Sequence, residues 1–205
     1  RAARSCGRRA ARDSRDVTLG QPRLHLRVVD STNERARELA ARGAPHGTLV
    51  TASAQTAGRG RQGRTWTAPA GRALLCSVVI RDPPRLLPLG AGVAVARIAG
   101  AQARLKWPND VLIDTRKIAG ILVEGRPQER WAVVGIGLNV AIEPHDFPPE
   151  LRDTAGTLGL GADAIEPMLE RLLAALELTL GAQDAEVLAE VRSRDALRGA
   201  PVRWS

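Results

Sequence analysis

The stretch RLKWPNDVLIDTRKIAGILVEGRPQERWAVVGIGLNV, residues 104–140, decides the fold of this 205-residue chain. Its apolar runs are short and rich in Val, Ile and Leu, and turn-forming residues such as Pro108 and Asn109 separate them, a pattern typical of strands joined by tight turns. We expect three strands here, one around 105–107, one running from 111–113 into 117–124, and one over 131–140. Strands this close in sequence form hairpins.

The flanking segments supply further strands and the helices. Alternating or continuous apolar patterns predict strands over 24–30, 47–56 and 73–80. Helical periodicity covers 31–43, which Gly43 closes, as well as 88–100, 165–180 and 184–194. Strands interspersed with helices, with hairpins in the middle, favour an α+β fold over a doubly wound parallel sheet.

Composition indicates one sizeable domain preceded by a basic extension. Aromatic residues make up 2% of the chain, so the core must be built from Val, Leu, Ile and Ala. The net charge of +8 would suit a nucleic-acid partner, but six arginines fall within residues 1–15 and account for much of it. No apolar run approaches the ~20 residues of a membrane span. Cys6 and Cys76 show no metal spacing and are not expected to form a disulfide, so a reduced, cytoplasmic setting fits best.

Lysine is almost absent from this basic chain. Of thirty Lys and Arg residues only Lys106 and Lys117 are lysines, and both lie in 104–120. A lysine ammonium is a compact point charge that meets a phosphate or carboxylate oxygen differently from a planar guanidinium. A role at such an oxygen is one interpretation, and chance survival of two surface lysines is the other.

The segment GRGRQG, residues 58–63, matches the dinucleotide-binding pattern G-x-G-x-x-G without its context. Pro69 and Gly71 leave no room for the helix that a Rossmann turn opens, and no Walker lysine follows. Glycines let backbone N–H groups approach an anion, and interleaved arginines can clamp its oxygens. We therefore expect an anion-binding loop that repels itself when empty, with a solvated basic loop as the alternative. Trp66, just beyond, could lie over a ligand ring or anchor the loop by packing.

Four motifs, AQTAGRGRQGRTW, RLKWPNDVLI, KIAGILVE and VVGIGLNV, together resemble the catalytic domain of biotin protein ligases, from about Leu24 to Leu188. The resemblance implies a mixed, largely antiparallel sheet flanked by helices, like that of class II aminoacyl-tRNA synthetases. It implies an enzyme that condenses biotin with ATP, with Mg²⁺, to biotinyl-5'-AMP. The biotin would then pass to a lysine of the biotin carboxyl carrier domain of acetyl-CoA carboxylase or a related carboxylase.

The same resemblance assigns roles to individual residues. The catalytic residues would be Lys117, Arg59 and Arg61, because two anions must meet and cations stabilise their transition state. Biotin would contact Ser31, Thr32, Asn33, Gln55, Gly58, Arg59, Gly60, Arg61, Lys117, Gly120 and Leu122. The nucleotide would contact Arg64, Trp66, Lys106, Asn109, Gly135, Gly137 and Asn139, and Asp110 would hold Mg²⁺.

Several of these residues also have a structural interpretation. Ser31 and Glu34 have the spacing of a capping box for the helix that follows. Asn109 with Asp110 could simply cap a turn, and the glycines of GIGLN could belong to a tightly packed strand. We expect Trp107 in the core.

We divide the chain into a disordered Arg-rich extension (1–22), a biotin/lipoate-ligase-like catalytic domain (23–195) and the start of a truncated small C-terminal β domain (196–205). No membrane association and no specific DNA binding are expected, and a homodimer stays open. Two alternatives lie within the superfamily, a lipoate or octanoate ligase or transferase and a truncated biotin-binding ligase with weak turnover. A nonenzymatic basic nucleic-acid-binding domain is the alternative from another class, although it would call for more stacking aromatics.

Overall fold

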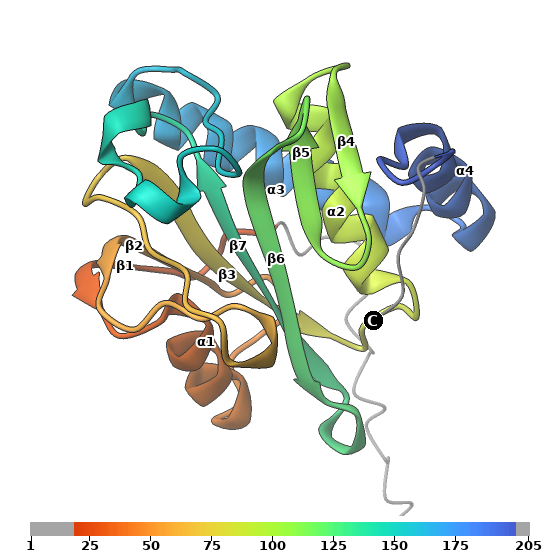
Figure 1. Cartoon of the computed structure of the whole chain (residues 1–205). Coiled ribbons are helices and arrows are strands. Elements are labelled where there is room, and N and C mark those ends of the chain that lie inside the picture. Colours follow the sequence, from red (N-terminus) through yellow and green to blue (C-terminus); the bar gives the residue numbers. More distant parts are fainter. Residues whose placement is uncertain (1–18, 200–205) are drawn as a thin grey trace, which may run out of the picture.

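A seven-stranded sheet organises the chain, in the order β1-β2-β3-β7-β6-β5-β4 (Figure 1). The computed structural model describes residues 19–199, so most of the expected extension and of the segment 196–205 lies outside the described residues. The strands are β1 Arg23–Val29, β2 Leu49–Gln55, β3 Ala73–Arg81, β4 Ala103–Lys106, β5 Asp110–Ile113, β6 Arg116–Arg126 and β7 Trp131–Asn139. The β1–β2 pair is parallel and the other five pairs are antiparallel. The predicted α+β fold with a largely antiparallel sheet is confirmed.

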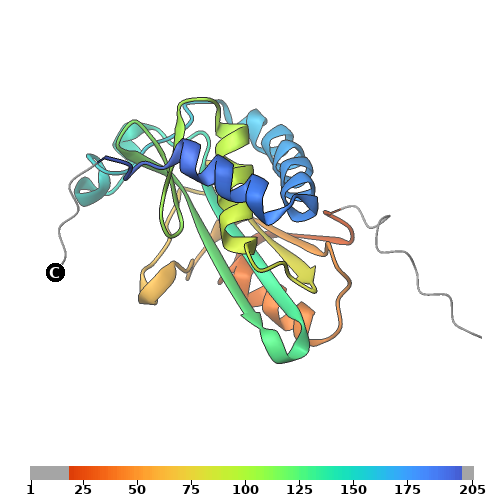
Figure 2. The ribbon, with the colours of Figure 1, turned by 90° about the vertical axis from the view of Figure 1, so that its right-hand side faces the viewer.

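Helices cover both faces of the sheet. The described α-helices are α1 Thr32–Ala41, α2 Leu87–Ala99, α3 Ile165–Gly181 and α4 Asp184–Arg194. Helices α2 and α3 pack on one face and α1 on the other, while α4 lies against α2 and β4 (Figures 1 and 2). None of these helices combines the length and the apolar character needed to cross a membrane.

Strand β7 shows how the two faces of the sheet differ. On the side of α2 and α3, alternate positions are all apolar and join the main core: Ala132, Val134, Ile136 and Leu138. On the opposite side Trp131 and Val133 pack with α1. The next positions on that side are Gly135, Gly137 and Asn139, so beyond α1 the sheet surface is largely bare backbone.

The expectation of three strands over residues 104–140 was wrong, because the structure has four. Residues 111–113 and 117–124 belong to separate strands, β5 and β6, joined by a two-residue turn in which Asp114 has φ 53°. A short polar side chain tolerates this left-handed conformation. The hairpin brings Asp110 opposite Gly120 and Leu112 opposite Lys117, with an irregularity in the register between Val111 and Leu112.

Trp107 is not in the core. It lies in the turn between Lys106 and Asp110, which pair as the last and first residues of β4 and β5. A side chain at a hairpin tip has no second layer to pack against, and Trp107 is 70% exposed.

Cys76 of β3 is a free, buried thiol whose burial raises its pKa to about 12.

The C-terminal end of α1 is fixed to the end of β3 by Arg81. Its guanidinium donates hydrogen bonds to the carbonyl oxygens of Ala40 (2.8 Å) and Ala44 (2.5 and 3.0 Å). Carbonyls at a helix C-terminus lack partners within the helix. Arg81 therefore determines where α1, and with it the first turn of α1, lies on the sheet.

We predict that Arg81→Met lowers the free energy of unfolding by about 1–2 kcal/mol, because the helix-end carbonyls lose a charged donor. Chemical denaturation followed by circular dichroism measures this. The matched control is Arg85→Met at an exposed position, which should change the value by less than about 0.5 kcal/mol. Equal midpoints for both variants would show that Arg81 does not anchor α1.

Candidate active site

Polar side chains from β2 and β3 hold the first turn of α1. The backbone N–H of Thr32 donates to Gln55 Oε1 (2.8 Å), and so does its hydroxyl (3.1 Å). Ser77 Oγ lies 2.9 Å from both Thr32 Oγ1 and Asn33 Oδ1. Ser31, Thr32, Asn33 and Ser77 are all buried. This is a buried, uncharged polar cluster whose hydrogen bonds fix its orientation.

The predicted capping box at Ser31 and Glu34 does not form. Ser31 is the N-cap residue of α1, but its side chain makes no capping hydrogen bond. Its backbone N–H donates to Asp30 Oδ1 (2.8 Å), and the Glu34 carboxylate turns outward to Arg37 and Arg59. The free N–H at the helix start is satisfied by Gln55 instead. The Glu34 carboxylate thus forms ion pairs with two arginines and does not cap the helix.

Gly120, Gly135 and Gly137 form a flat strip of backbone that we call the glycine shelf. Gly120 and Gly137 lie opposite each other on β6 and β7, and Gly135 lies opposite Leu122. A Cβ atom added to Gly135 would overlap Asn33 Oδ1, and one added to Gly137 would overlap the indole of Trp66. At Gly120 the added atom would lie 3.0 Å from Trp66 Cζ3. Glycine is required here because other groups approach the backbone closely.

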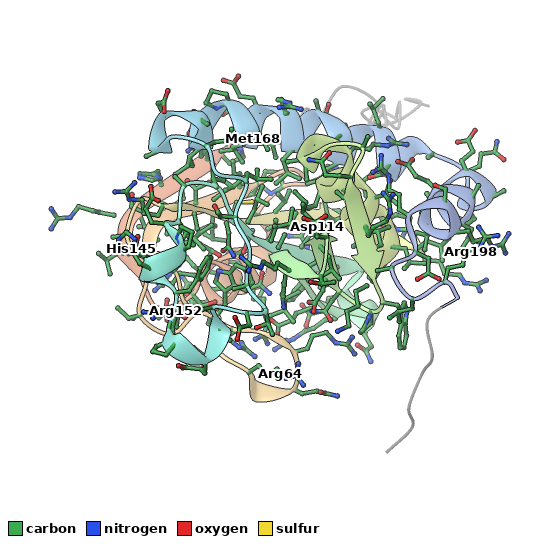
Figure 3. All side chains as sticks on the ribbon, turned by 45° about the horizontal axis from the view of Figure 1, so that its top comes forward. Arg64, Asp114, His145, Arg152, Met168 and Arg198 are labelled. Carbon is green, nitrogen blue, oxygen red and sulfur yellow. The ribbon has the colours of Figure 1, made fainter. Side chains whose placement is uncertain are left out.

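The Gly/Arg loop, residues 58–66, folds as a narrow hairpin. Gly58 and Trp66 are joined by a backbone hydrogen bond of 2.9 Å, and a Cβ on Gly58 would overlap the Trp66 carbonyl oxygen. At the tip Gln62 has φ 54° and Gly63 has φ 74°. The hairpin carries the Trp66 indole inward onto the glycine shelf. Arg61 and Arg64 at its tip are exposed and pair with no carboxylate of the described residues. Figure 3 shows Arg64 at the outer end of the loop.

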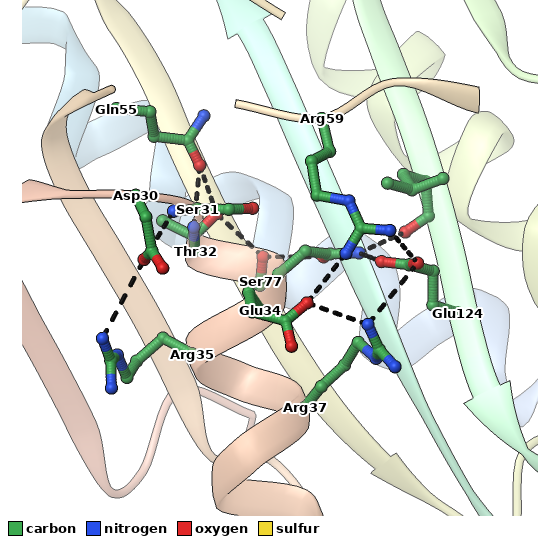
Figure 4. A network of polar contacts seen from close by, with 12 residues as sticks. Asp30, Ser31, Thr32, Glu34, Arg35, Arg37, Gln55, Arg59, Ser77 and Glu124 are labelled. Carbon is green, nitrogen blue, oxygen red and sulfur yellow. Dashed lines mark hydrogen bonds and ion pairs between the residues drawn. The ribbon is translucent and has the colours of Figure 1, made fainter. Parts of the chain in front are cut away.

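Arg59 in the same loop is held by two carboxylates (Figure 4). Its guanidinium lies 2.8 Å from Glu34 Oε2 and 3.1 Å from Glu124 Oε1. The expected self-repulsion of the loop is therefore partly offset. Sequence reasoning missed Glu124 and Ser77, although each was visible as a polar residue: Ser77 lies within the apolar run ALLCSVVI, and Glu124 ends the run KIAGILVE.

Lys117 lies between an acid and an aromatic ring. Its ammonium is 2.7 Å from Asp110 Oδ1 and 5.6 Å from the centroid of the Trp66 ring. Asp110 Oδ1 and Trp66 Nε1 are the two buried side-chain polar atoms of the described residues without a hydrogen-bond partner. The Lys117–Asp110 contact thus has the distance of an ion pair but not the angles of a hydrogen bond. Asp110 is therefore paired with Lys117 by charge, whereas the Trp66 indole N–H has no hydrogen-bond partner among the described residues.

Of the remaining predicted residues, three line a cavity and one has a structural role. Lys106, Asn109 and Asp110 line a largely apolar cavity of about 230 Å³ bounded by α2, the β4–β5 turn and the end of α4. Asn139 donates from Nδ2 to the Gly156 carbonyl oxygen (2.8 Å). Its own carbonyl oxygen accepts from the Leu158 N–H (3.0 Å), so Asn139 holds a neighbouring segment in place.

The chain is similar in sequence to known proteins. The family model described as "Biotin/lipoate A/B protein ligase family" matches residues 25–140, more than half of the chain. Over 156 residues the chain is 42% identical to the bifunctional ligase/repressor BirA of Bacillus subtilis, which covers 70% of this chain and 48% of that protein. Over 207 residues it is 34% identical to the biotin–acetyl-CoA-carboxylase ligase of Mycobacterium tuberculosis, covering 91% and 77%. The chain spans about half the length of the first curated relatives it matches.

Solved structures are similar as well. A biotin protein ligase from Aquifex aeolicus in complex with biotin and ATP gives a TM-score of 0.74 at 30% identity, covering 86% of this chain and 79% of that one. The biotin acetyl coenzyme A carboxylase synthetase of Helicobacter pylori, with bound biotinylated ATP, gives 0.62 at 26% identity, covering 81% and 78%. With its sheet, its glycine shelf and its extended match to such relatives, the chain belongs to the biotin/lipoate A/B protein ligase family.

Proposed function

We propose that this chain is a biotin–protein ligase, with residues 23–195 as its catalytic unit. It activates biotin with ATP to biotinyl-5'-AMP and transfers biotin to a lysine of a carboxyl carrier domain in the cytoplasm. The observation that carries the proposal is the arrangement around Lys117: a half-buried cation that pairs with the Asp110 carboxylate at 2.7 Å and adjoins the Trp66 ring, at the edge of a glycine shelf. Relatives and structural neighbours that are biotin ligases support it.

The neutral polar cluster at the start of α1 favours biotin over lipoate or octanoate. Biotin carries an uncharged bicyclic ring with N–H and C=O groups, which can exchange hydrogen bonds with Ser31, Thr32 and Gln55 beside the shelf. A dithiolane ring or an alkyl chain offers no N–H or C=O groups, so it would gain no hydrogen bonds from this cluster. Asn33 contacts the Leu122 carbonyl oxygen (3.4 Å) and so ties the cluster to β6.

In the first half-reaction a carboxylate oxygen of biotin attacks the α-phosphorus of ATP. The bond from that phosphorus to the oxygen bridging the β-phosphorus breaks, and pyrophosphate leaves. Because both reactants are anions, cations at the meeting point lower the barrier. Lys117 is placed for this role, and exposed Arg61 and Arg64 supply charge from the loop to the polyphosphate. Trp66 offers its ring face to the nucleotide side.

Asp110 is the residue that would hold Mg²⁺. Its carboxylate lines the cavity and lies 2.7 Å from the Lys117 ammonium, and Mg²⁺ is commonly held by one or two carboxylates together with phosphates and water. The described residues contain no group of three or more His, Cys, Asp or Glu side chains able to hold a metal alone. Bound Mg²⁺ would neutralise charge on the ATP phosphates.

In the second half-reaction the neutral amine of the carrier lysine attacks the acyl carbon of the adenylate. An amide bond forms, the bond between the acyl carbon and the phosphate oxygen breaks, and AMP leaves with loss of one proton from the amine. The acceptor is therefore a carrier domain that presents an accessible lysine amine.

ATP–pyrophosphate exchange tests the proposal directly. We expect exchange that depends on biotin and is at least about tenfold weaker with lipoate or octanoate, since neither acid offers ring N–H or C=O groups to the polar cluster. Exchange with lipoate or octanoate that equals the exchange with biotin would assign the chain to another branch of the superfamily. No exchange with any of the three acids would overturn the assignment as an adenylating enzyme.

We predict that Lys117→Arg lowers the exchange rate by about 100-fold or more, although the charge is kept. A planar guanidinium fork would meet Asp110 and the Trp66 ring with a different geometry from the compact ammonium. Arg116→Lys, the reverse exchange at the exposed neighbouring position, serves as the control and should retain the parental rate. Parental activity in Lys117→Arg would remove Lys117 from the chemistry.

We predict that Gly135→Ala raises the KM for biotin by about 10- to 100-fold, the effect of losing one or two buried hydrogen bonds. The added methyl group would overlap Asn33 Oδ1 and displace that side chain from Ser77. Gly181→Ala, where an added Cβ meets nothing within 4 Å, is the control and should behave as the parent chain. An unchanged KM in Gly135→Ala would place biotin away from the shelf.

A further inference from the structure

Arg59 joins three segments that are distant in the sequence. The loop supplies Arg59, the first turn of α1 supplies Glu34 and β6 supplies Glu124 (Figure 4). Each terminal nitrogen of the guanidinium has its own carboxylate, at 2.8 and 3.1 Å. An arginine that pairs with acids from two different elements links its own segment to both of them.

A second arginine completes the network. Arg37, one turn after Glu34, lies 2.8 Å from Glu34 Oε2 and 3.9 Å from Glu124 Oε1. Two carboxylates and two guanidinium groups give no net charge. The side chains of Arg59, Glu34 and Glu124 are 43%, 38% and 21% exposed, so each ion pair is partly screened by water. Such a network favours the closed position of the loop and still allows the loop to open.

Glu124 also connects the loop to the proposed biotin subsite. Its Oε1 accepts from Arg59, and its Oε2 accepts from Asn33 Nδ2 at 2.7 Å. Asn33 in turn contacts Ser77 and lies against Gly135. One carboxylate is therefore shared by the loop and by a residue that faces the shelf, so that a change in the orientation of Asn33 alters the acceptor available to Arg59.

We propose that Glu34 and Glu124 are positioning residues that latch the Gly/Arg loop over the glycine shelf through Arg59. Arg59 is the anchor of the loop, while Arg61 and Arg64 remain as its anion-facing cations. The latch holds the hairpin that carries Trp66 onto Gly120 and Gly137. The consequence of the latch for catalysis, that a latched loop would retain the adenylate, rests on the proposed function. The effect of the latch on the loop itself does not rest on that function.

Limited proteolysis tests the latch without any substrate, because trypsin cleaves after arginine. Initial rates of cleavage after Arg61 and Arg64, followed by mass spectrometry on the full chain, should rise about three- to fivefold in Glu124→Gln and in Glu34→Gln, the range expected for partly exposed ion pairs. Cleavage after Arg152, which is exposed and distant in sequence, should not change. Glu38→Gln is the matched control, because Glu38 lies on α1 and pairs with Arg35 in the same i,i+3 geometry.

In this proposal Glu34 and Glu124 act on the loop through Arg59, and a double-mutant comparison tests that dependence. In an Arg59→Gln background the cleavage rates after Arg61 and Arg64 should already be high, and adding Glu124→Gln should raise them no further. Equal rates in the parent, Glu38→Gln, Glu34→Gln and Glu124→Gln would overturn the latch. An undiminished effect of Glu124→Gln without Arg59 would overturn it too.

An enzymatic measurement separates this inference from the proposed function. If the parent catalyses biotin-dependent exchange, Glu124→Gln and Glu34→Gln should release biotinyl-adenylate about three- to fivefold faster, and Glu38→Gln should match the parent. Release rates that stay parental while the loop is cleaved faster would show that the latch does not retain the adenylate. If the parent shows no exchange, the proposed function is wrong, and the proteolysis rates still test whether Glu34 and Glu124 hold the loop.

Discussion

The close approach of other groups to the backbone of β6 and β7 is the constraint on which the site depends. Every second residue of β7 must be apolar because it packs against α2 and α3. The residues between them face the other side of the sheet, and those beyond α1 must be glycine where other groups approach the backbone. The register that pairs Gly120 with Gly137 and Leu122 with Gly135 places the bare positions together. A slip of one residue would turn Ile136 toward Asn33 and Trp66 and turn the glycines into the core. Core packing and the site therefore specify the same register.

The site has two chemically different halves. At the start of α1 the groups are buried, neutral and hydrogen-bonded to one another, with Gln55 and Ser77 as the central partners. At the other end of the shelf Lys117 and Asp110 are charged and only half-buried. A ligand with an uncharged polar ring at one end and a carboxylate at the other matches this division, because each end meets the environment in which its desolvation costs least.

Local patterns in the sequence were sufficient for most elements, and contacts between distant residues account for the errors. Periodicity and glycines predicted α1 to within two residues at each end. The turn at Asp114 was missed because the apolar pattern continues on both sides of it. The capping box at Ser31 was wrong because Arg59, twenty-five positions after Glu34, takes the Glu34 carboxylate. No local signal indicates which acid an arginine will meet. The motifs located the shelf and Lys117, while the network that holds Arg59 became visible only in three dimensions.

The scarcity of lysine is informative at one of its two positions. Lys117 stands at the centre of the site with Asp110 and Trp66, whereas Lys106 is an exposed residue at the edge of the cavity behind the turn. A carboxylate faces Lys117, as carboxylates face Arg59. The side chains of Lys117 and Arg59 are 35% and 43% exposed, so water screens both ion pairs. Under the proposed function, an anion that binds beside Lys117 would exchange partners with Asp110. Its affinity would then depend on the difference in free energy between two ion pairs, and so on the geometry of a single ammonium.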